Sequence, residues 1–473
     1  MDILPQILSE FRSNLAEDSS LYQEIGKLIS TVYQNPGVTN YVELIKQTDK
    51  EFRKKALTLI KQVLEKADML YRCSAERKQL YYVKQTRSRT IITVFGDLTY
   101  KRTEYIDKDT KAPFCYVDWK FDIRKRERYD PCVQALIIDG YADNNSMIKV
   151  GKIVGDRISG AFNTSIDGNT AIPRQTVRKI ILRHQNLKEE VERVDNTPDI
   201  LYIMADEKFI HLQGEMEKTG SEMVKTAVIF EDIRPVKRKD GSNTKRNQII
   251  NKTIVANSNI DFWDTVIDVL YKKYDMKKVK KVYLMGDGGS WIKAGVDLLK
   301  HPNYKVKFGI DSFHFNQAVK RISLNRDVCR ILADYARHDL KKEFKHLVRS
   351  TVETYPEREE IIQQNIDYIM NHWNYYQISI NEIEIGCPME QAIAHVLASV
   401  FTSVAKAYGR KHLPTYVNNR IIQQNNYDMR TVVLNKISRD STDYQEFDFS
   451  IFEKKNYPNR VIHDFNQDVI TKF

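Results

Sequence analysis

The spacing of apolar residues changes along the chain and predicts different elements in different regions. Between residues 1 and 85, apolar residues recur every three or four positions with charges between them, as in "YVELIKQTDKEFRKKALTLIKQVLEKA", which predicts helices. The stretch "TIITVFGDLTYKRTEYID" alternates instead, with a Gly-Asp turn in its middle, and predicts a hairpin from about Thr90 to Ile106. The N-terminal region is therefore expected to be mainly helical with a small β-hairpin segment.

A second helical block is expected at about 130–190. Two segments with helical spacing are separated by a glycine-bearing loop, and the second starts near Pro173 and is rich in Arg and Lys. A helix, a turn and a basic helix are typical of a helix-turn-helix, although plain helical packing gives the same pattern. The apolar positions that define the two faces are Val150, Ile153 and Val154, and then Val177, Ile180 and Ile181.

From residue 199 the pattern predicts alternating strands and helices. "DILYIMAD" is expected to be a short buried strand ending at Asp206, "KFIHLQG" a strand that could pair with it, and "VKTAVIFEDI" a third strand. A polar loop at 234–246 precedes the strand-like "QIINKTIV" and the helix "DFWDTVIDVLYKKY". "KKVYLMGDGG" predicts a strand ending at Asp287, followed by the helix "WIKAGVDLLK" and by a strand ending at Asp311.

The remaining residues are expected to be helical up to a polar tail. Residues 313–378 are predicted to be almost entirely helical, and "MEQAIAHVLASVFTSVAKAY" predicts a further helix whose apolar positions are 393, 396, 397, 400, 401 and 404. From Gly409 the chain is rich in Asn, Arg and Tyr. This order of elements predicts an α/β domain with a mixed sheet flanked by helices.

Three carboxylates stand at positions where chemistry is plausible. Asp206 and Asp287 end hydrophobic strands, where sites form in such sheets. Glu390 falls in the first turn of a helix after Pro388, on the face of the apolar stripe, so its carboxylate needs a partner. Two Asp and one Glu suit Mg²⁺ or Mn²⁺, and two such ions can catalyse displacement at phosphorus. Ordinary capping or turn acids explain the same positions.

The stretch "MGDGGSWIK" does not resemble a phosphate-binding loop. It lacks both the Gly-Lys-Ser/Thr of a P-loop and the three spaced glycines of a dinucleotide-binding motif. Gly288 and Gly289 are expected to let the chain turn tightly beside Asp287. Trp291 is expected to pack the following helix in place.

Charge and composition narrow the class of protein. The net charge of +11 attracts polyanions, so nucleic acid or an anionic membrane surface is a candidate partner, while a merely basic soluble protein has the same balance. The five cysteines contain no CxxC pair, which argues against a zinc ribbon or a redox dithiol. No apolar run is long enough to span a bilayer and no export signal is evident, so an intracellular, cytoplasmic protein is expected.

Four ordered blocks resemble one known family. "YIMADEKFIHLQ", "MGDGGSWIK", "GIDSFHFNQAVKRI" and "GCPMEQAIAHVLAS" look like successive blocks of the ISLre-type bacterial insertion-sequence transposases, distant relatives of the Mutator-like transposases. "TVFGDLTYKRTEYID" is similar to the segment that precedes them. The resemblance spans roughly residues 90–405. The chain departs from the family's usual pattern at Met285, Lys208 and Phe209, where that family usually has an acid, an acid and a histidine.

The resemblance implies a DDE transposase with an RNase H-like catalytic domain and a helical insertion at about 313–385. Carried over by position, the metal-binding triad is Asp206, Asp287 and Glu390, with two Mg²⁺ or Mn²⁺ ions. "DSFH" matches a signature of the wider group and singles out Asp311 and His314, as structural support or as direct help at the site. Water would attack a phosphodiester at the element end, and the freed 3′-hydroxyl would attack target DNA.

The expected domains are a helical region (1–88), a β-hairpin with a helix-turn-helix-like DNA-binding region (89–195), the catalytic domain (196–408) and a basic, polar tail (409–473). The expected partners are double-stranded DNA, as terminal inverted repeats and target, and further copies of the chain in a dimer or larger assembly at the bacterial nucleoid. The alternatives are an RNase H-like nuclease without strand transfer and an inactive, transposase-derived DNA-binding protein. The residues expected to contact DNA are Arg124, Lys125, Arg126, Arg128, Arg174, Arg178, Lys179, Lys237, Arg238, Lys239, Arg410 and Lys411.

Overall fold

The computed structural model describes most of the chain as two compact units. The described residues are 37–160, 171–213, 220–238, 242–383, 385, 394–402 and 407–444. Those of the first unit fall within Met1–Ile138, Ser146–His184 and Arg430–Phe473, and those of the second within Asp139–Asn145 and Gln185–Met429. Each unit contains a β-sheet of its own.

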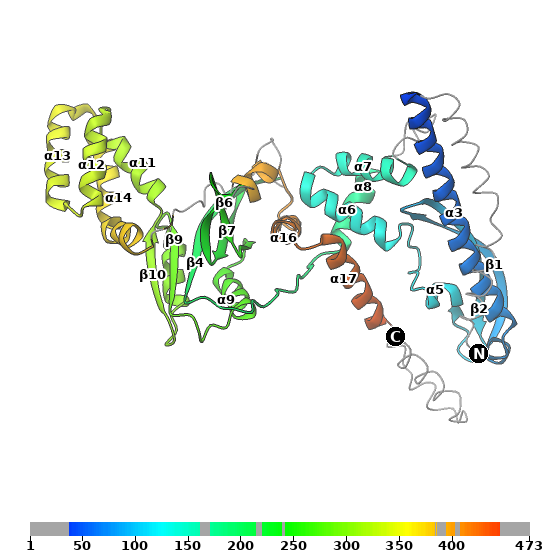
Figure 1. The fold of residues 1–473 in the computed structure, drawn as a ribbon. Helices are drawn as coiled ribbons and strands as arrows, with labels where there is room; N and C mark the ends of the chain where they lie inside the picture. Colours follow the sequence, from blue (N-terminus) through cyan, green and yellow to red (C-terminus); the bar gives the residue numbers. More distant parts are fainter. Residues whose placement is uncertain are drawn as a thin grey trace. The chain divides into compact units, whose positions relative to one another are not determined.

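Unit 1 combines a long helix, a β-hairpin and a group of shorter helices (Figure 1). Its elements are α3 (Val38–Cys73), α4 (Ala75–Leu80), β1 (Tyr81–Thr93), β2 (Gly96–Asp107), β3 (Pro113–Phe114), α5 (Tyr116–Lys120), α6 (Pro131–Asn144, whose last residues belong to unit 2), α7 (Met147–Ser159), α8 (Arg174–Arg183) and most of α17 (Met429–Tyr444). The strand order is β1-β2-β3. A small core forms where α3 and α5 meet the hairpin, from Leu64, Ile91, Leu98, Tyr100 and Val117.

Strand β2 pairs with β1 along one edge and with β3 only at Tyr105 and Ile106 of the other edge. Helix α3 covers that other edge between residues 97 and 104, where no described strand pairs with it. Glu65 Oε1 accepts a hydrogen bond from the Lys101 amide at 2.8 Å, and Asp68 accepts from the amide and the hydroxyl of Thr103 at 3.1 and 2.6 Å. Unpaired strand edges favour association with other chains, and carboxylates from a helix satisfy this one internally. The acids that appear in the sequence as part of an amphipathic helix therefore fix the hairpin to α3.

The hairpin is longer than the sequence pattern predicts. Helices were expected up to residue 85 and the hairpin from about Thr90, whereas β1 starts at Tyr81 and pairs with β2 as far as Asp107. The segment from Tyr82 to Ser88 is almost entirely exposed, so it lacks the apolar alternation that marks a strand with one buried face. In the helical block, Ile153 was expected on a buried face but is 49% exposed, while Val150, Val154, Val177, Ile180 and Ile181 are buried as expected.

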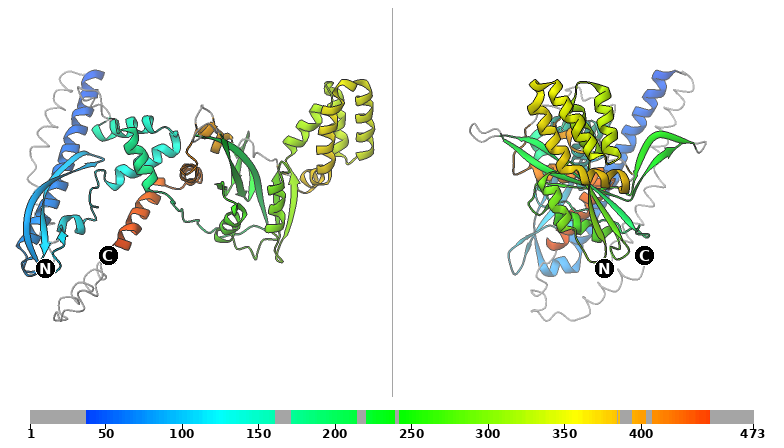
Figure 2. Two further views of the ribbon diagram at one scale, coloured as in Figure 1. Left: turned by 180° about the vertical axis from the view of Figure 1, so that it is seen from behind. Right: turned by 90° about the vertical axis from the view of Figure 1, so that its left-hand side faces the viewer.

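Unit 2 contains a mixed five-stranded sheet with helices around it (Figure 2). The sheet order is β10-β9-β4-β5-β8, with β4, β9 and β10 parallel and with β5 antiparallel to both β4 and β8. The strands are β4 (Ile200–Leu212), β5 (Gly220–Phe230), β6 (Asp232–Lys237), β7 (Asn243–Ile250), β8 (Thr253–Asn257), β9 (Lys281–Gly286) and β10 (Lys305–Ile310). The expected α/β class with a mixed sheet is confirmed.

Two local expectations about this sheet are wrong. "KFIHLQG" is not a separate partner strand, because β4 continues through Asp206 to Leu212 and pairs with β5 from Tyr202 to Leu212. The segment 234–246 is not simply a loop, since its described residues contribute to β6 and β7, which form a separate two-stranded ribbon. In both places antiparallel pairing extends a strand beyond its apolar stretch, and such pairing leaves no period in the sequence.

The helices of unit 2 are α9 (Phe262–Lys273), α10 (Ser290–Leu298), α11 (Ser312–Ile322), α12 (Arg326–Arg337), α13 (Lys341–Thr354), the 3₁₀ turn η1 (Pro356–Arg358), α14 (Glu359–Ile378), the π-helices η2 (Ser379–Ile383) and η3 (Ala394–Thr402), and α16 (Leu413–Gln424). The expected helical stretch after β10 is confirmed, and α11 to α14 stand beyond the β10 edge of the sheet (Figure 1). Of the apolar stripe expected in the last helix, Val396, Leu397, Val400 and Phe401 are buried, while positions 393 and 404 lie outside the described residues.

The expected polar tail from Gly409 is in part a core element. Helix α16 packs against β8 and η3, and it buries Leu413, Tyr416, Val417, Ile421 and Ile422. Its buried Arg420 donates to the carbonyl oxygens of Val396 and His395 at 3.1 and 3.0 Å. In the sequence, a buried arginine with backbone partners cannot be distinguished from an exposed one. The polar composition of this segment therefore predicted a tail where the structure has a packed helix.

Candidate active site

Three aspartates occupy matching positions just beyond the point where the pairing between the parallel strands ends. Met204, Met285 and Gly309 are paired across β4, β9 and β10, and the residue two positions further along each chain is an aspartate: Asp206, Asp287 and Asp311. Side chains two positions apart on a strand share a face. The backbone supports this extension of the register, because the Asp311 amide donates to the carbonyl oxygen of Gly286 at 2.8 Å. Strand alignment therefore gathers residues that are 81 and 24 positions apart in the sequence.

Asp206 does not end its strand, contrary to the expectation from the sequence. It lies within β4, paired with Thr226 of β5, but beyond the last residue of β4 that pairs with β9. The pKa of Asp206 is raised to about 6, mainly by burial and to a smaller extent by the charges of Asp287 and Glu207. The Glu207 amide, which donates to Asp206 Oδ1 at 2.7 Å, and the charge of His314 act in the opposite direction. The structure thus holds two carboxylates, Asp206 and Asp287, close enough to repel each other.

Asp311 and His314 form a fixed pair beside these carboxylates. Asp311 is the N-cap of α11, where its Oδ1 accepts from the Phe313 amide at 2.9 Å and its Oδ2 accepts from His314 Nδ1 at 3.1 Å. This hydrogen bond raises the pKa of His314, and the charges of Asp311, Asp206 and Asp287 raise it further. Asp311 is buried, whereas the His314 side chain is 36% exposed. The exposed ring is the group that can meet a ligand.

The two glycines shape the loop after β9. Gly288 has a φ of +94°, and a Cβ at this position would collide with the His372 ring. The Gly289 amide donates to Asp287 Oδ1 at 2.9 Å and so orients that carboxylate. Trp291 does more than pack its helix, because its Nε1 donates to Glu207 Oε2 at 2.6 Å. Glu207 thus points to the opposite face of the sheet from Asp206, as strand alternation predicts.

Helix α14 contributes residues that sequence reasoning missed. The Tyr368 hydroxyl donates to the carbonyl oxygen of Asp287 at 3.0 Å. His372 Nδ1 donates to the carbonyl oxygen of Tyr368 at 2.7 Å, which leaves Nε2 to accept from Lys293 Nζ at 3.0 Å. Burial, and after it the neighbouring Lys293, lowers the pKa of His372. No local sequence pattern identifies Tyr368 or His372 as residues of the site. For Lys293 the one available signal was its position, one helical turn after the glycines.

The described part of this site contains two neighbouring carboxylates, Asp206 and Asp287, whose charges act on each other. Glu390, the third expected ligand, lies outside the described residues, and among the residues that are described no three His, Cys, Asp or Glu side chains form a candidate metal site. Carboxylate oxygens are the donors that Mg²⁺ and Mn²⁺ prefer. Burial, and after it the charges of Asp287 and Glu207, raises the pKa of Asp206, and a bound cation would favour the ionised carboxylate. The donor chemistry of the pair fits such an ion.

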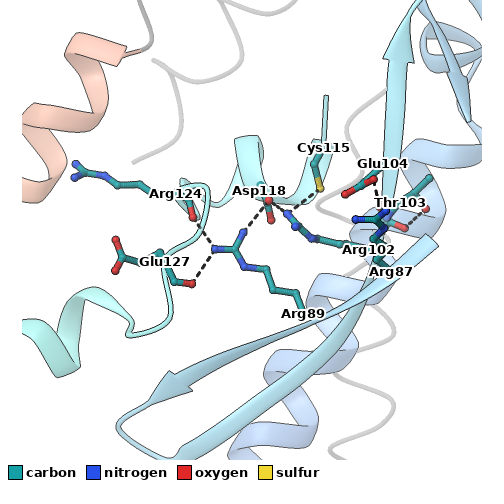
Figure 3. A network of polar contacts seen from close by, with 10 residues as sticks. Arg87, Arg89, Arg102, Thr103, Glu104, Cys115, Asp118, Arg124 and Glu127 are labelled. Atoms are coloured by element: carbon teal, nitrogen blue, oxygen red, sulfur yellow. Dashed lines mark hydrogen bonds and ion pairs between the residues drawn. The ribbon is translucent and has the colours of Figure 1, made fainter. Parts of the chain in front are cut away.

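The basic cluster 124–128 of unit 1 is held by a buried network, shown in Figure 3. Arg89 donates to Asp118 Oδ2 at 2.8 Å and to the carbonyl oxygens of Arg124 and Glu127 at 2.6 and 3.1 Å. Arg102 forms a second ion pair with Asp118. Because the loop carbonyls bond inward, its backbone is fixed.

The residues expected to contact DNA are not equally available. Arg124 donates to the carbonyl oxygen of Ile437 at 3.0 Å, and Arg410 forms an ion pair with Glu222 at 2.7 Å. Lys239 lies outside the described residues. The remaining candidates are exposed on their own unit: Lys125, Arg126, Arg128, Arg174, Arg178 and Lys179 on unit 1, and Lys237, Arg238 and Lys411 on unit 2.

Comparisons with known proteins give a family but no activity. The family model described as "Uncharacterised protein family (UPF0236)" matches residues 37–437. Two UPF0236 proteins of Caldanaerobacter subterraneus subsp. tengcongensis are 25% identical over 403 residues and 26% identical over 404 residues. Each alignment covers 84% of this chain, and they cover 79% and 80% of the two relatives. The relatives therefore share most of their length with this chain, and they are bacterial.

Among solved structures, the Drosophila P element transposase strand transfer complex is similar over 67% of this chain and 82% of the matched chain, at 10% sequence identity. The TM-score of 0.24 is too low to establish a common fold. Within the part of the chain that the structure describes, no helix has the length and apolar character needed to cross a membrane.

Proposed function

We propose that this chain, which belongs to the uncharacterised family UPF0236, is a DNA transposase of the ISLre type that cleaves and joins DNA strands with a DDE site in an RNase H-like domain. One observation supports the proposal: Met204 of β4 pairs with Met285 of the parallel strand β9, two residues before Asp206 and Asp287, and the charge of Asp287 acts on Asp206. The resemblance of the sequence blocks requires these two aspartates to be neighbours. The mixed sheet followed by a helical insertion is the architecture that the same resemblance implies.

Protein groups around the carboxylates have separable tasks. Gly289 orients the carboxylate of Asp287, while Tyr368 holds the backbone of the same residue. Asp311 fixes the ring of His314, and its hydrogen bond raises the pKa of His314, which favours the protonated form. A protonated, partly exposed imidazole can donate a hydrogen bond to a phosphate oxygen. We assign His314 this contact with the scissile phosphate.

In this proposal Asp206, Asp287 and Glu390 would hold two Mg²⁺ or Mn²⁺ ions, which would supply positive charge to stabilise the attacking and leaving oxygens at phosphorus. The reaction proceeds by direct attack, first of water on a phosphodiester and then of the 3′-hydroxyl on target DNA. No covalent protein intermediate is required. A dimer or larger assembly is part of the proposal, because two DNA ends must be joined at one target.

The test is a cleavage and strand-transfer assay on the DNA that flanks the gene, with Mg²⁺ and without it. The variant is Asp287→Asn, and the matched control is Asp268→Asn, which removes an exposed carboxylate from the same unit. Cleavage by Asp287→Asn is expected to fall by at least about 10³-fold, or roughly 4 kcal/mol of transition-state stabilisation, with DNA binding retained. The control is expected to cleave like the unmodified chain.

Each alternative has its own result in this assay. Cleavage without a strand-transfer product identifies an RNase H-like nuclease, and DNA binding without cleavage identifies a transposase-derived binding protein. Cleavage that survives Asp287→Asn at the normal rate contradicts the carboxylate site itself.

A further inference from the structure

Unit 1 contains an open groove that none of the expected DNA contacts includes. It has a volume of about 590 Å³ and lies between α3, the turn that joins β1 to β2, and the C-terminal end of α7. Its lining combines basic and hydroxylated side chains with apolar ones, including one exposed aromatic ring. The residues that matter for its chemistry are Lys50, Lys54, Thr58, Lys61, Phe95 and Thr99.

One wall of the groove is a row of lysines on α3. Lys50, Lys54 and Lys61 are exposed, and their spacing of four and seven residues places them on one face of the helix. At about 1.5 Å per residue, the row is roughly 16 Å long. Among the described residues neither Lys50 nor Lys61 forms an ion pair, whereas Lys54 Nζ lies 3.7 Å from Glu51 Oε2. Asp97 is the only acid in the lining, so the wall carries an excess of positive charge.

Hydrogen bonds to backbone carbonyl oxygens hold the opposite wall of the groove in place. Arg53 Nη1 donates to the carbonyl oxygens of Val94 and Ile158 at 3.0 and 3.3 Å, which ties the hairpin turn and α7 to α3. The Phe95 amide donates to Thr93 Oγ1 at 3.1 Å, and the Phe95 ring is 40% exposed at the groove. The groove is thus formed before any ligand arrives.

A polar face of the hairpin continues from the groove. Thr99 lines the groove and shares a hydrogen bond of 2.8 Å with Thr90 across the two strands. The next pair on the same face, Ser88 and Lys101, is also exposed. Hydroxyls, lysines and backbone amides are the groups that contact phosphates in DNA complexes, and they position the duplex without reading its sequence.

We infer that this groove binds the phosphate backbone of duplex DNA, with Lys50, Lys54 and Lys61 on successive phosphates and Phe95 against a sugar or base edge. The inference rests on the proposed function only in taking DNA as the polyanion. The positive charge of the lysine row extends over roughly 16 Å, which suits a regular row of phosphates better than a small anion. The exposed ring adds an apolar contact that a purely electrostatic surface lacks.

The test measures binding by the full chain to a fluorescein-labelled duplex of the flanking DNA, in EDTA, over a series of salt concentrations. The triple variant Lys50→Gln, Lys54→Gln, Lys61→Gln is expected to lower the log–log salt slope by about 2.7 and to weaken binding at least tenfold at low salt. Each single substitution is expected to lower the slope by about 0.9. Phe95→Ala is expected to weaken binding with an unchanged slope.

The matched control is the triple variant Lys277→Gln, Lys342→Gln, Lys345→Gln, which removes the same charge from exposed positions of unit 2. An equal loss of slope in both triple variants would overturn the inference, because only net charge would then matter. A triple variant of the groove that keeps the original slope would overturn it as well. Because EDTA blocks metal-dependent cleavage, these results do not depend on whether the carboxylate site is catalytic. The single variants keep the inference testable if the triple variant does not fold.

Discussion

The two units each enclose a carboxylate, and they treat it in opposite ways. In unit 1, Asp118 has a 16% exposed side chain and faces two guanidinium groups, from Arg89 and Arg102 (Figure 3). In unit 2, burial and after it the nearby charges of Asp287 and Glu207 raise the pKa of Asp206 to about 6. The first carboxylate is compensated by positive charge from its own unit. The second carboxylate is buried near another negative charge, which lowers the free energy of unfolding.

This difference separates a structural role from a functional one. Asp118 anchors Arg89, which in turn holds the carbonyl oxygens of the loop 124–128, so the negative charge serves the fold. Asp206 has no guanidinium partner of this kind: among the described groups whose charges act on it, His314 is the only one of opposite sign. Sites that bind a metal or a reacting group keep such unfavourable charge because the ligand relieves it.

The largest expected effect on stability comes from removing the compensated carboxylate. Asp118→Asn leaves two buried or half-buried guanidinium groups without their counter-charge, so the free energy of unfolding is expected to fall by about 3–5 kcal/mol in urea denaturation. The control Asp268→Asn breaks an exposed ion pair with Lys272 and is expected to cost less than about 1 kcal/mol. Equal effects of the two substitutions would show that the network does not hold unit 1 together.

The next effect tests how the fold places the uncompensated carboxylate. Gly288→Ala puts a side chain at positive φ and drives its Cβ into the His372 ring, which is expected to cost about 2–4 kcal/mol in urea denaturation. The control Gly220→Ala meets nothing within 4 Å and is expected to be nearly neutral. Adding His372→Ala to Gly288→Ala is expected to remove the collision and leave the cost of the backbone conformation, about 1 kcal/mol. If the double variant is still destabilised by the full amount seen in Gly288→Ala, the strain does not come from the collision with His372.

The smallest effect has the opposite sign and depends on pH. The pKa of Asp206 in the folded chain, about 6, lies above its value in the unfolded chain, so the folded state binds the proton more tightly. Stability is therefore lost as the pH rises from about 4 to 6, and the loss persists above 6. In EDTA, Asp206→Asn is expected to raise the free energy of unfolding at pH 8 by about 1–3 kcal/mol and to change it little at pH 4. Thermal or urea unfolding at the two pH values measures this, and destabilisation at pH 8 would contradict it.

The sequence predicted the parts of the fold that depend on burial with a regular period. The strands before Asp287 and Asp311, helix α9 and the helical stretch after β10 all bury apolar residues on one face or along their whole length, so each leaves a repeat that can be read locally. The first half of β1, the ribbon of β6 and β7, and α16 were missed or misread. Two of them are stabilised by backbone pairing between polar strands, and the third by a buried arginine with backbone partners.

By itself, the sequence determined that Asp206, Asp287 and Asp311 follow or lie within hydrophobic strands, because strand formation is written in a short stretch of residues. Only the tertiary structure decided that these three residues lie at matching positions on neighbouring segments. The register between β4, β9 and β10 depends on backbone hydrogen bonds between segments that are distant in the sequence. The tertiary structure also brought Tyr368 and His372 to the loop of Asp287, through packing of α14 beside β10. Long-range pairing and packing carry no local signal, and for that reason the shape of the site was beyond the sequence.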